Sequence, residues 1–181
     1  ELERTVGALQ NTFPQLNVLI NNGGIQYRYD FSTAEDVPPK IAEEVAVNLT
    51  ALMRLTHMLL PVLARQPEAA VMNVSSMLGF IPKQSAPVYC ATKAAVHVFS
   101  KALRYQLADT TVKVFEVVPP PVDTDMTRER VKFKMSPAAF VQEALQGVRR
   151  DRYETQVGWA KILITLHRFF PALAESMLRN K

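Results

Sequence analysis

Short apolar runs alternate along this chain with longer amphipathic segments, and this alternation limits its fold more than any other feature. Strands are expected in the short runs, at 17–21, 69–75, 112–118 and 153–157. Helices are expected where apolar residues recur every three or four positions, at 1–13, 39–65 and 87–108, from Ser136-Pro137 and from near Trp159. Strands that are separated by helices run parallel and are joined by right-handed crossovers. The sequence therefore predicts an α/β fold with a doubly wound parallel sheet.

Length and composition are those of one globular domain spanning 1–181. Of the 181 residues, 48% are hydrophobic and 21% are charged, which is ordinary for a domain with its own core. No apolar run reaches the ~18–20 residues of a membrane span. The single cysteine, Cys90, excludes an internal disulfide and suits a reducing compartment, so a cytoplasmic location is expected. We interpret Cys90 as a small residue that packs a helix rather than as a functional thiol.

The net charge of +4 comes mainly from basic residues at 128–134, at 149–152 and at the C-terminus. No basic run is interleaved with aromatic residues at a spacing typical of base stacking, so a solvated face is expected rather than a nucleic-acid site. The histidines, His57, His97 and His167, are scattered along the chain. No cluster has metal-ligand spacing, and no metal is expected.

Three residues have the spacing of a site for proton transfer to an oxygen. Tyr89 and Lys93 lie four positions apart, on one face of a predicted helix, and Ser76 follows a predicted strand thirteen residues earlier. A phenol has a pKa near ~10, and an ammonium one turn away is expected to lower it, which would produce an acid or base suited to neutral pH. Taken alone, a tyrosine and a lysine at this spacing can also be a solvated pair on a helix surface.

The predicted sheet brings several polar residues to one edge. Ligands of doubly wound sheets bind at the carboxyl ends of the strands. Asn21 and Asn22, Ser76 and Pro119 all fall at such ends. We therefore expect these residues and the Tyr89 helix to meet at the same edge.

Five segments resemble, in the same order, the motifs of the short-chain dehydrogenase/reductase family. They are N-N-G-G at 21–24, V-N-L at 47–49, N-V-S-S-x-x-G at 73–79, Y-x-A-T-K-A-A at 89–95 and P-x-x-V-x-T-x-M at 119–126. The resemblance covers essentially the whole chain and implies a classical, Rossmann-like member. The runs Y-C-A-T-K-A-A-x-H, L-R-Y-Q-L and V-P-P-P-V are similar to the DltE-like branch.

This resemblance implies reduction of a carbonyl or oxidation of an alcohol with NAD or NADP. Tyr89 would transfer the proton, Lys93 would lower its pKa and bind the nicotinamide ribose, Ser76 would hold the substrate oxygen, and Asn48 would anchor a water in the proton relay. Ser75 is the weaker candidate for the serine role, because its spacing to Tyr89 is one residue too long. Asn48 could otherwise be a solvated or locally bonded side chain. The cofactor contacts implied by the resemblance are Asn21, Asn22, Gly23, Gly24, Tyr89, Lys93, Pro119, Val122 and Thr124.

The chain departs from the family pattern at three places. Gly23 replaces an alanine, and Pro120 replaces a glycine and so offers no N–H. Aligned by motif, the chain begins just before the family's fourth strand, so the first strands and the glycine-rich turn for the cofactor pyrophosphate are expected to be missing. The 181 residues are therefore expected to be the C-terminal two-thirds of a domain, inactive and poorly stable alone. The alternative is a non-catalytic binding or assembly subunit, if these residues are the complete product.

Two further features concern partners. The helices at 39–65 and 87–108 match those of the family's four-helix interface, so a homodimer or homotetramer is expected.

The last helix has an apolar stripe opposite Lys161, Arg168 and Arg179. The stripe consists of Trp159, Ile162, Leu163, Leu166, Phe169, Phe170 and Leu173. We expect it to pack on its own domain or on a subunit partner rather than on a membrane, and we expect Pro171 to kink or break this helix.

Overall fold

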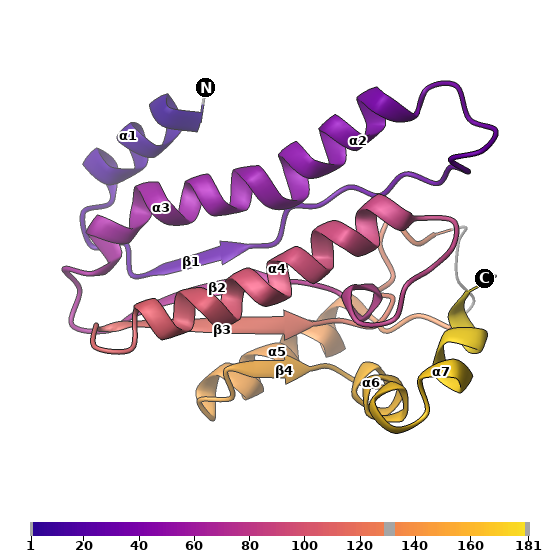
Figure 1. Cartoon of the computed structure of the whole chain (residues 1–181). Helices are drawn as coiled ribbons and strands as arrows, with labels where there is room; N and C mark the ends of the chain where they lie inside the picture. Colours follow the sequence, from indigo (N-terminus) through magenta and orange to yellow (C-terminus); the bar gives the residue numbers. More distant parts are fainter. Residues whose placement is uncertain (1, 129–132, 180–181) are drawn as a thin grey trace.

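The computed structural model describes residues 2–128 and 133–179, and a sheet of four parallel strands forms its centre (Figure 1). The strands are β1 (Val18–Asn21), β2 (Ala69–Val74), β3 (Val112–Val118) and β4 (Glu154–Gln156), in the order β1-β2-β3-β4. Helical segments connect each strand to the next, as parallel neighbours require. The predicted parallel α/β sheet is confirmed.

The helices occur where the apolar periodicity indicates them. They are α1 (Leu2–Thr12), α2 (Val37–Val45), α3 (Ala51–Leu63), α4 (Pro87–Gln106), α5 (Pro137–Arg149), α6 (Ala160–Phe169) and α7 (Pro171–Leu178). A short 3-10 helix, η2 (Met77–Gly79), follows β2. Ser136 caps α5 by accepting a hydrogen bond from the Ala139 N–H, and Pro171 separates α6 from α7. Both boundary predictions are thus confirmed.

The helix predicted at 39–65 differs from an ordinary α-helix. It contains a π-helical turn, η1 (Ala46–Thr50), between α2 and α3, and Asn48 lies within this turn. Single π turns interrupt α-helices mostly at functional positions. Neither apolar periodicity nor helix propensity distinguishes such a turn, which explains why the sequence predicted a regular helix.

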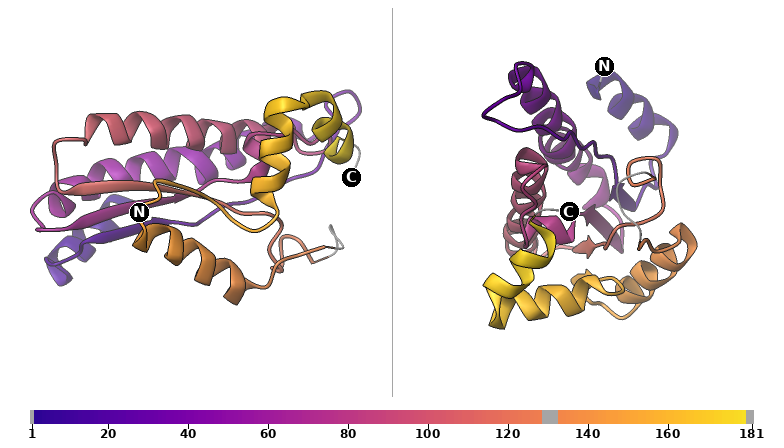
Figure 2. Two further views of the ribbon diagram at one scale, coloured as in Figure 1. Left: turned by 90° about the horizontal axis from the view of Figure 1, so that it is seen from below. Right: turned by 90° about the vertical axis from the view of Figure 1, so that its right-hand side faces the viewer.

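Helices cover both faces of the sheet (Figure 2). On one face α3 packs on β1 and β2, and α4 packs on β2 and β3. On the other face Ala144 of α5 joins a cluster with Met72, Phe115 and Val117. Beyond the end of β3, another hydrophobic cluster joins η2 to α6 and α7. It consists of Met77, Ile81, Val118, Ala160, Leu163 and Ala174. Part of the C-terminal apolar stripe therefore packs on the domain, as expected.

Buried amides fix the helices to the sheet. Asn21 donates from Nδ2 to Asn73 Oδ1 at 2.8 Å and to Thr56 Oγ1 at 3.1 Å. Asn73 in turn donates to Ser100 Oγ at 2.9 Å. This chain of bonds links β1 and β2 to α3 and α4, and it directs Asn21 into the interior.

The helical run Val37–Leu63 is long and apolar enough to cross a membrane by length and composition alone. This corrects the expectation that no segment meets that criterion. Leu52, Leu59 and Leu63 of this run are buried, and Glu44 and Asn48 are fully buried. Of its most apolar window, 28% is buried, and α3 contacts β1 and β2.

Candidate active site

Ser76 and Tyr89 meet at the carboxyl end of β2. Ser76 is the extended residue that begins η2, and its Oγ accepts a hydrogen bond from the Leu78 N–H at 3.1 Å. The Ser76 side chain also lies near the Tyr89 hydroxyl, on the first turn of α4, and acts to lower the Tyr89 pKa. Both residues are buried, with 7% and 9% of their surfaces exposed. The structure therefore brings together two residues that the sequence predicted to act on one oxygen.

Lys93 lies one turn after Tyr89 on α4, and its ammonium reaches the same region. Nζ donates to the main-chain oxygen of Val74 at 2.8 Å and lies 5.8 Å from the centre of the Tyr89 ring. Only 4% of Lys93 is exposed. The close packing of η2 on α4 fixes this helix, because a Cβ on Gly79 would lie 2.8 Å from the main-chain carbon of Lys93.

The pKa of Tyr89 differs in direction from the sequence prediction. Burial raises the Tyr89 pKa from 10.0 to about 12, although the hydrogen bond with Ser76 acts to lower it. Burial also lowers the pKa of Lys93 from 10.5 to about 8. The sequence prediction considered only the attraction between ammonium and phenolate, whereas removal from water disfavours both charged forms. The prediction of a lowered phenol pKa was therefore wrong for this structure.

Asn48 joins the site through the π-helical turn. Its side chain forms a paired contact with Ile25, accepting from the main-chain N–H at 2.8 Å and donating to the carbonyl at 2.9 Å. It also donates to Thr92 Oγ1 at 3.2 Å, next to Lys93 on α4. Asn48 is fully buried, which excludes the solvated alternative and leaves its side chain as a link between the segment after β1 and α4.

The four predicted cofactor residues at 21–24 lie in different environments. A Cβ on Gly24 would lie 3.4 Å from Asn48 Oδ1 and 3.5 Å from Lys93 Nζ, so bare backbone faces both side chains. Asn22 and Gly23 are exposed, and nothing lies within 4 Å of a Cβ on Gly23. Asn21 faces the interior as part of the amide network. Gly24 therefore adjoins the site, whereas Asn21 stabilises the sheet.

The segment after β3 contacts the site through its first residue. The carbonyl of Pro119 accepts a hydrogen bond from the Met77 N–H at 3.3 Å, directly after Ser76. Val122 forms a bridge with Met135, and the exposed Thr124 donates from Oγ1 to the Val122 carbonyl at 3.5 Å. The structure thus places Pro119 beside the serine and leaves the Thr124 hydroxyl facing solvent.

The sequence analysis missed two buried carboxylates near these residues. Glu44, one turn before Asn48, accepts hydrogen bonds from Tyr29 Oη at 2.8 Å and from the Tyr27 N–H at 3.1 Å. Its charge is one of the smaller influences that raise the Tyr89 pKa. Glu44 thereby holds the aromatic segment after β1 against α2. Its position four residues before Asn48, on the buried face of the helix, was the available signal.

The second buried carboxylate is Glu116 on β3, and it binds Ser75, one of the two candidate serines. It accepts from Ser75 Oγ at 2.5 Å and lies 2.8 Å from His97 Nδ1. Because Ser75 is held by this carboxylate while Ser76 influences the Tyr89 hydroxyl, Ser76 remains the better candidate for the serine role. Ligand atoms of His97, Glu116 and Glu154 lie within 4.8 Å of one another, a cluster that the sequence did not predict. Both Glu116 oxygens already have these partners.

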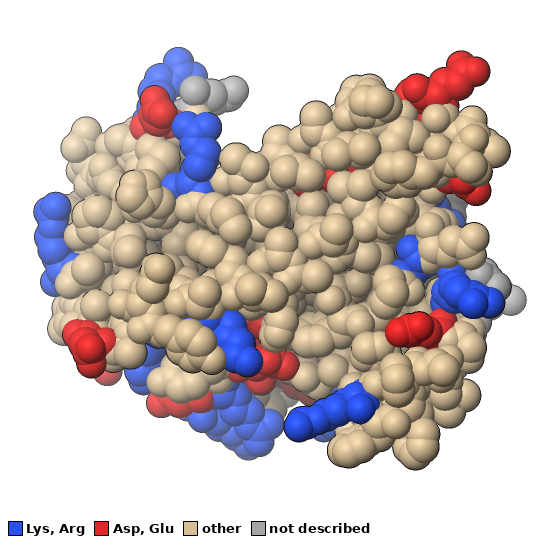
Figure 3. Space-filling view, in the orientation of Figure 1, with Lys and Arg blue, Asp and Glu red and all other residues tan. Residues whose placement is uncertain are grey.

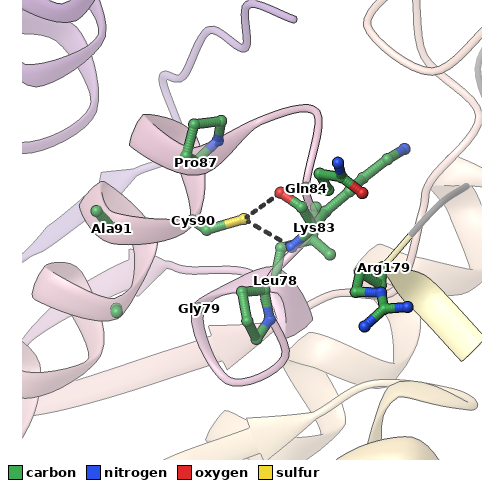
Figure 4. A pocket seen from close by; sticks show the side chains of 10 residues that line it. Leu78, Gly79, Lys83, Gln84, Pro87, Cys90, Ala91 and Arg179 are labelled. Carbon is green, nitrogen blue, oxygen red and sulfur yellow. Dashed lines mark hydrogen bonds between the residues drawn. The ribbon is translucent and has the colours of Figure 1, made fainter. Parts of the chain in front are cut away.

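A pocket of about 600 Å³ lies beside the first turns of α4 (Figure 4). Its lining includes Gly79, Lys83, Cys90, Ala91 and Arg179. The Cys90 thiol accepts from the Lys83 N–H at 3.3 Å, and burial raises the thiol pKa. Both observations agree with a packing role for Cys90.

Comparisons with known proteins agree with this fold. The family model described as short chain dehydrogenase matches residues 1–134. The uncharacterized oxidoreductase DltE of Bacillus subtilis (strain 168) is 40% identical over 148 residues, which are 78% of this chain and 59% of that protein. The human very-long-chain 3-oxoacyl-CoA reductase is 30% identical over 138 residues, which are 74% of this chain and 44% of that protein. The chain thus spans about half the length of the curated relatives it matches.

A solved structure agrees over the whole chain. A short chain dehydrogenase from Burkholderia cenocepacia J2315, in complex with NADP, superposes with a TM-score of 0.89 and covers 100% of this chain and 76% of its own, at 24% identity. Fold and site together define an α/β protein with a Ser-Tyr-Lys group at the carboxyl edge of its sheet. The chain belongs to the short-chain dehydrogenase family, a family of oxidoreductases.

Proposed function

We propose that this chain forms the catalytic part of an NAD- or NADP-dependent oxidoreductase that interconverts a carbonyl and an alcohol. The placement of Ser76 and Lys93 beside the buried Tyr89 carries this proposal. Two relatives, of whose lengths this chain covers 59% and 44%, support the class of reaction. The solved relative in complex with NADP supports the class of cofactor. We assign this activity to the full-length protein, in which a glycine-rich turn would bind the cofactor pyrophosphate.

Residues of this chain fit a nicotinamide cofactor at one point. The bare backbone at Gly24, next to Lys93 Nζ and Asn48 Oδ1, leaves open a place that a larger side chain would fill. Lys93 would hold the ribose there, and Pro119, Val122 and Thr124 would flank the ring. When bound, the cofactor supplies or accepts a hydride.

The protein groups complete the reaction by moving a proton. Tyr89 with a pKa of about 12 keeps its proton at neutral pH, so in reduction its Oη–H donates to the substrate oxygen as negative charge develops there. Ser76 holds that oxygen by a second hydrogen bond. The Lys93 ammonium favours the phenolate that remains, and Asn48 holds the relay that returns a proton. In alcohol oxidation each of these transfers runs in reverse.

Replacement of one hydroxyl tests this function. In the full-length protein, Tyr89→Phe should lower kcat for carbonyl reduction to a few per cent of wild type or less, while thermal unfolding stays unchanged. Tyr105→Phe is the matched control, because Tyr105 lies on the same helix but is 68% exposed. Consumption of reduced cofactor is the measurement. Activity retained in Tyr89→Phe would remove the proposed proton donor.

A non-catalytic binding or assembly role is the second candidate. It is favoured by the exposed apolar side chains of β1, Val18 at 43% and Ile20 at 53%. The two candidates differ in one measurement, cofactor-dependent turnover by the full-length protein.

We also propose a cytoplasmic homodimer or homotetramer. The outer face of α3 and α4 is a broad uncharged surface in Figure 3, and on α4 it exposes Val98 at 64% and Tyr105 at 68%. Sedimentation of wild type and Val98→Arg at micromolar concentration tests the interface. We expect an assembled wild type and a dissociated variant, and a monomeric wild type would contradict the proposal.

A further inference from the structure

The two C-terminal helices expose an unusual amount of apolar surface. Figure 2 shows α6 and α7 at a corner of the molecule. We use the term C-terminal apolar patch for the exposed large residues of this corner, which are Ile162, Phe169, Phe170, Leu173 and Met177. Their exposed fractions are 67%, 67%, 61%, 55% and 45%, respectively. These side chains are therefore exposed in the part of the chain that the structure describes.

The packed and exposed residues of α6 lie on different sides of the helix. Ala160 and Leu163 are buried in the cluster with Val118 and Ala174. Ile162 and Phe169, seven positions apart, share a face that this cluster does not cover. The apolar stripe of the sequence is thus wider than the domain can bury, and its second half is available to an external partner.

Most of the charged residues beside the patch are basic. Lys161 and Arg168 are exposed on α6 and lie seven positions apart, next to Ile162 and Phe169 in the sequence. Arg179 is exposed at the end of α7. The acidic exception on these helices is Glu175, which lies 3.3 Å from His167, and α6 contains no Asp or Glu. In Figure 3 the surface over α6 and α7 is mostly uncharged, with basic and acidic side chains at its margin.

We propose that the C-terminal apolar patch binds the surface of an anionic lipid bilayer. A helix with exposed aromatic and aliphatic residues beside Lys and Arg lies in a membrane interface, where the apolar residues enter the acyl boundary and the cations contact lipid headgroups. Aromatic side chains suit this boundary, and each cation adds attraction to anionic lipid. A protein partner would not require cations along this margin, whereas an anionic bilayer explains both the apolar and the basic residues.

Vesicle binding of the full chain tests this inference. We expect co-sedimentation with vesicles of phosphatidylcholine and phosphatidylglycerol, weaker binding to phosphatidylcholine alone, and a decrease as salt rises. Phe169→Ser with Phe170→Ser should lower the vesicle partition coefficient by about tenfold or more. Lys161→Gln with Arg168→Gln should lower binding to the anionic vesicles but not to phosphatidylcholine. Phe13→Ser, which removes a 55% exposed phenylalanine elsewhere, and Lys101→Gln are the matched controls.

The only tryptophan, Trp159, adds a readout that does not depend on any variant. It directly precedes α6 and is the N-cap residue of that helix. Brominated lipids in anionic vesicles should quench its fluorescence in the wild-type chain if α6 approaches the bilayer. Lack of both quenching and co-sedimentation overturns the proposal. So does equal binding of wild type and the phenylalanine double variant, or a double variant that only converts an oligomer to a monomer.

Discussion

Lys93 donates a hydrogen bond from Nζ to the main-chain oxygen of Val74, 2.8 Å away, and so joins α4 to the end of β2. The contact holds the ammonium within the site but removes it almost completely from water. A neutral carbonyl compensates only part of this lost hydration, which is why burial lowers the Lys93 pKa to about 8. The structure thus couples the position of a proposed catalytic group to the pH dependence of stability.

The stability of the chain should rise between pH 8 and pH 10 because of Lys93. The pKa is 10.5 in the unfolded reference and about 8 in the folded chain, so the unfolded state binds more protons in this window and the free energy of unfolding increases with pH. Below pH 8 both states are protonated and this gain is lost. One pKa unit is about 1.4 kcal/mol, so the effect is on the order of a few kcal/mol.

Urea unfolding of wild type and Lys93→Met at several pH values measures this effect. Wild type should gain stability relative to the variant as pH rises to 10, and a difference that stays constant would contradict the pKa assignment. Tyr89 acts oppositely above pH 10, because its folded pKa is raised from 10.0 to about 12. The folded state then retains a proton that the unfolded state has lost, so stability falls there.

Ser76→Ala and Ser75→Ala should have different consequences in the full-length protein. Ser76→Ala removes the partner of Tyr89, and kcat should fall about a hundredfold with little change in stability. Ser75→Ala removes a donor from the buried Glu116 carboxylate, so it should cost about 1–3 kcal/mol of stability and affect kcat less. Kinetics and thermal unfolding of both variants are the measurements. If kcat falls equally in the two variants, the serine role does not belong to Ser76 alone.

Gly79→Ala should destabilise the chain and disturb the site together. Its Cβ would lie 2.8 Å from the Lys93 main-chain carbon and 2.9 Å from the Ala94 nitrogen, so α4 must move. We expect a loss of about 1–3 kcal/mol. Gly7→Ala is the control, because no atom lies within 4 Å of that Cβ on α1, and it should stabilise by about 0.5–1 kcal/mol. Chemical unfolding compares them, and a stable Gly79→Ala would show that η2 does not constrain α4.

The 181-residue chain should aggregate through β1. Val18 and Ile20 are 43% and 53% exposed, and β1 lies at one end of the strand order β1-β2-β3-β4. An apolar edge strand offers unpaired N–H and C=O groups to another chain. Val18→Lys with Ile20→Lys should therefore slow aggregation, as light scattering would measure. Phe13→Lys removes a comparably exposed apolar residue outside the strand. If it slows aggregation equally, exposed apolar surface in general, and not the edge of β1, causes the aggregation.

The sequence by itself determined the elements and the identity of the central residues. Alternation of short apolar runs with amphipathic segments predicted the parallel sheet, since periodicity depends on local geometry that each segment carries with it. The same holds for the Ser136 cap and the break at Pro171. The spacing of Ser76, Tyr89 and Lys93, together with the five family-like motifs, predicted that these residues meet, because their relative positions follow from one strand end and one helix.

Only the tertiary structure decided the properties that depend on neighbours distant in sequence. The sequence favoured Ser76 over Ser75 by spacing alone, and only the structure shows that Ser75 is held by Glu116, which lies on another strand. The direction of the Tyr89 pKa depended on how completely η2, α2 and α4 exclude water, and no local pattern records that. Likewise, the sequence showed an apolar stripe at 159–173, but the packing of α6 and α7 decided which of its side chains are buried and which are exposed.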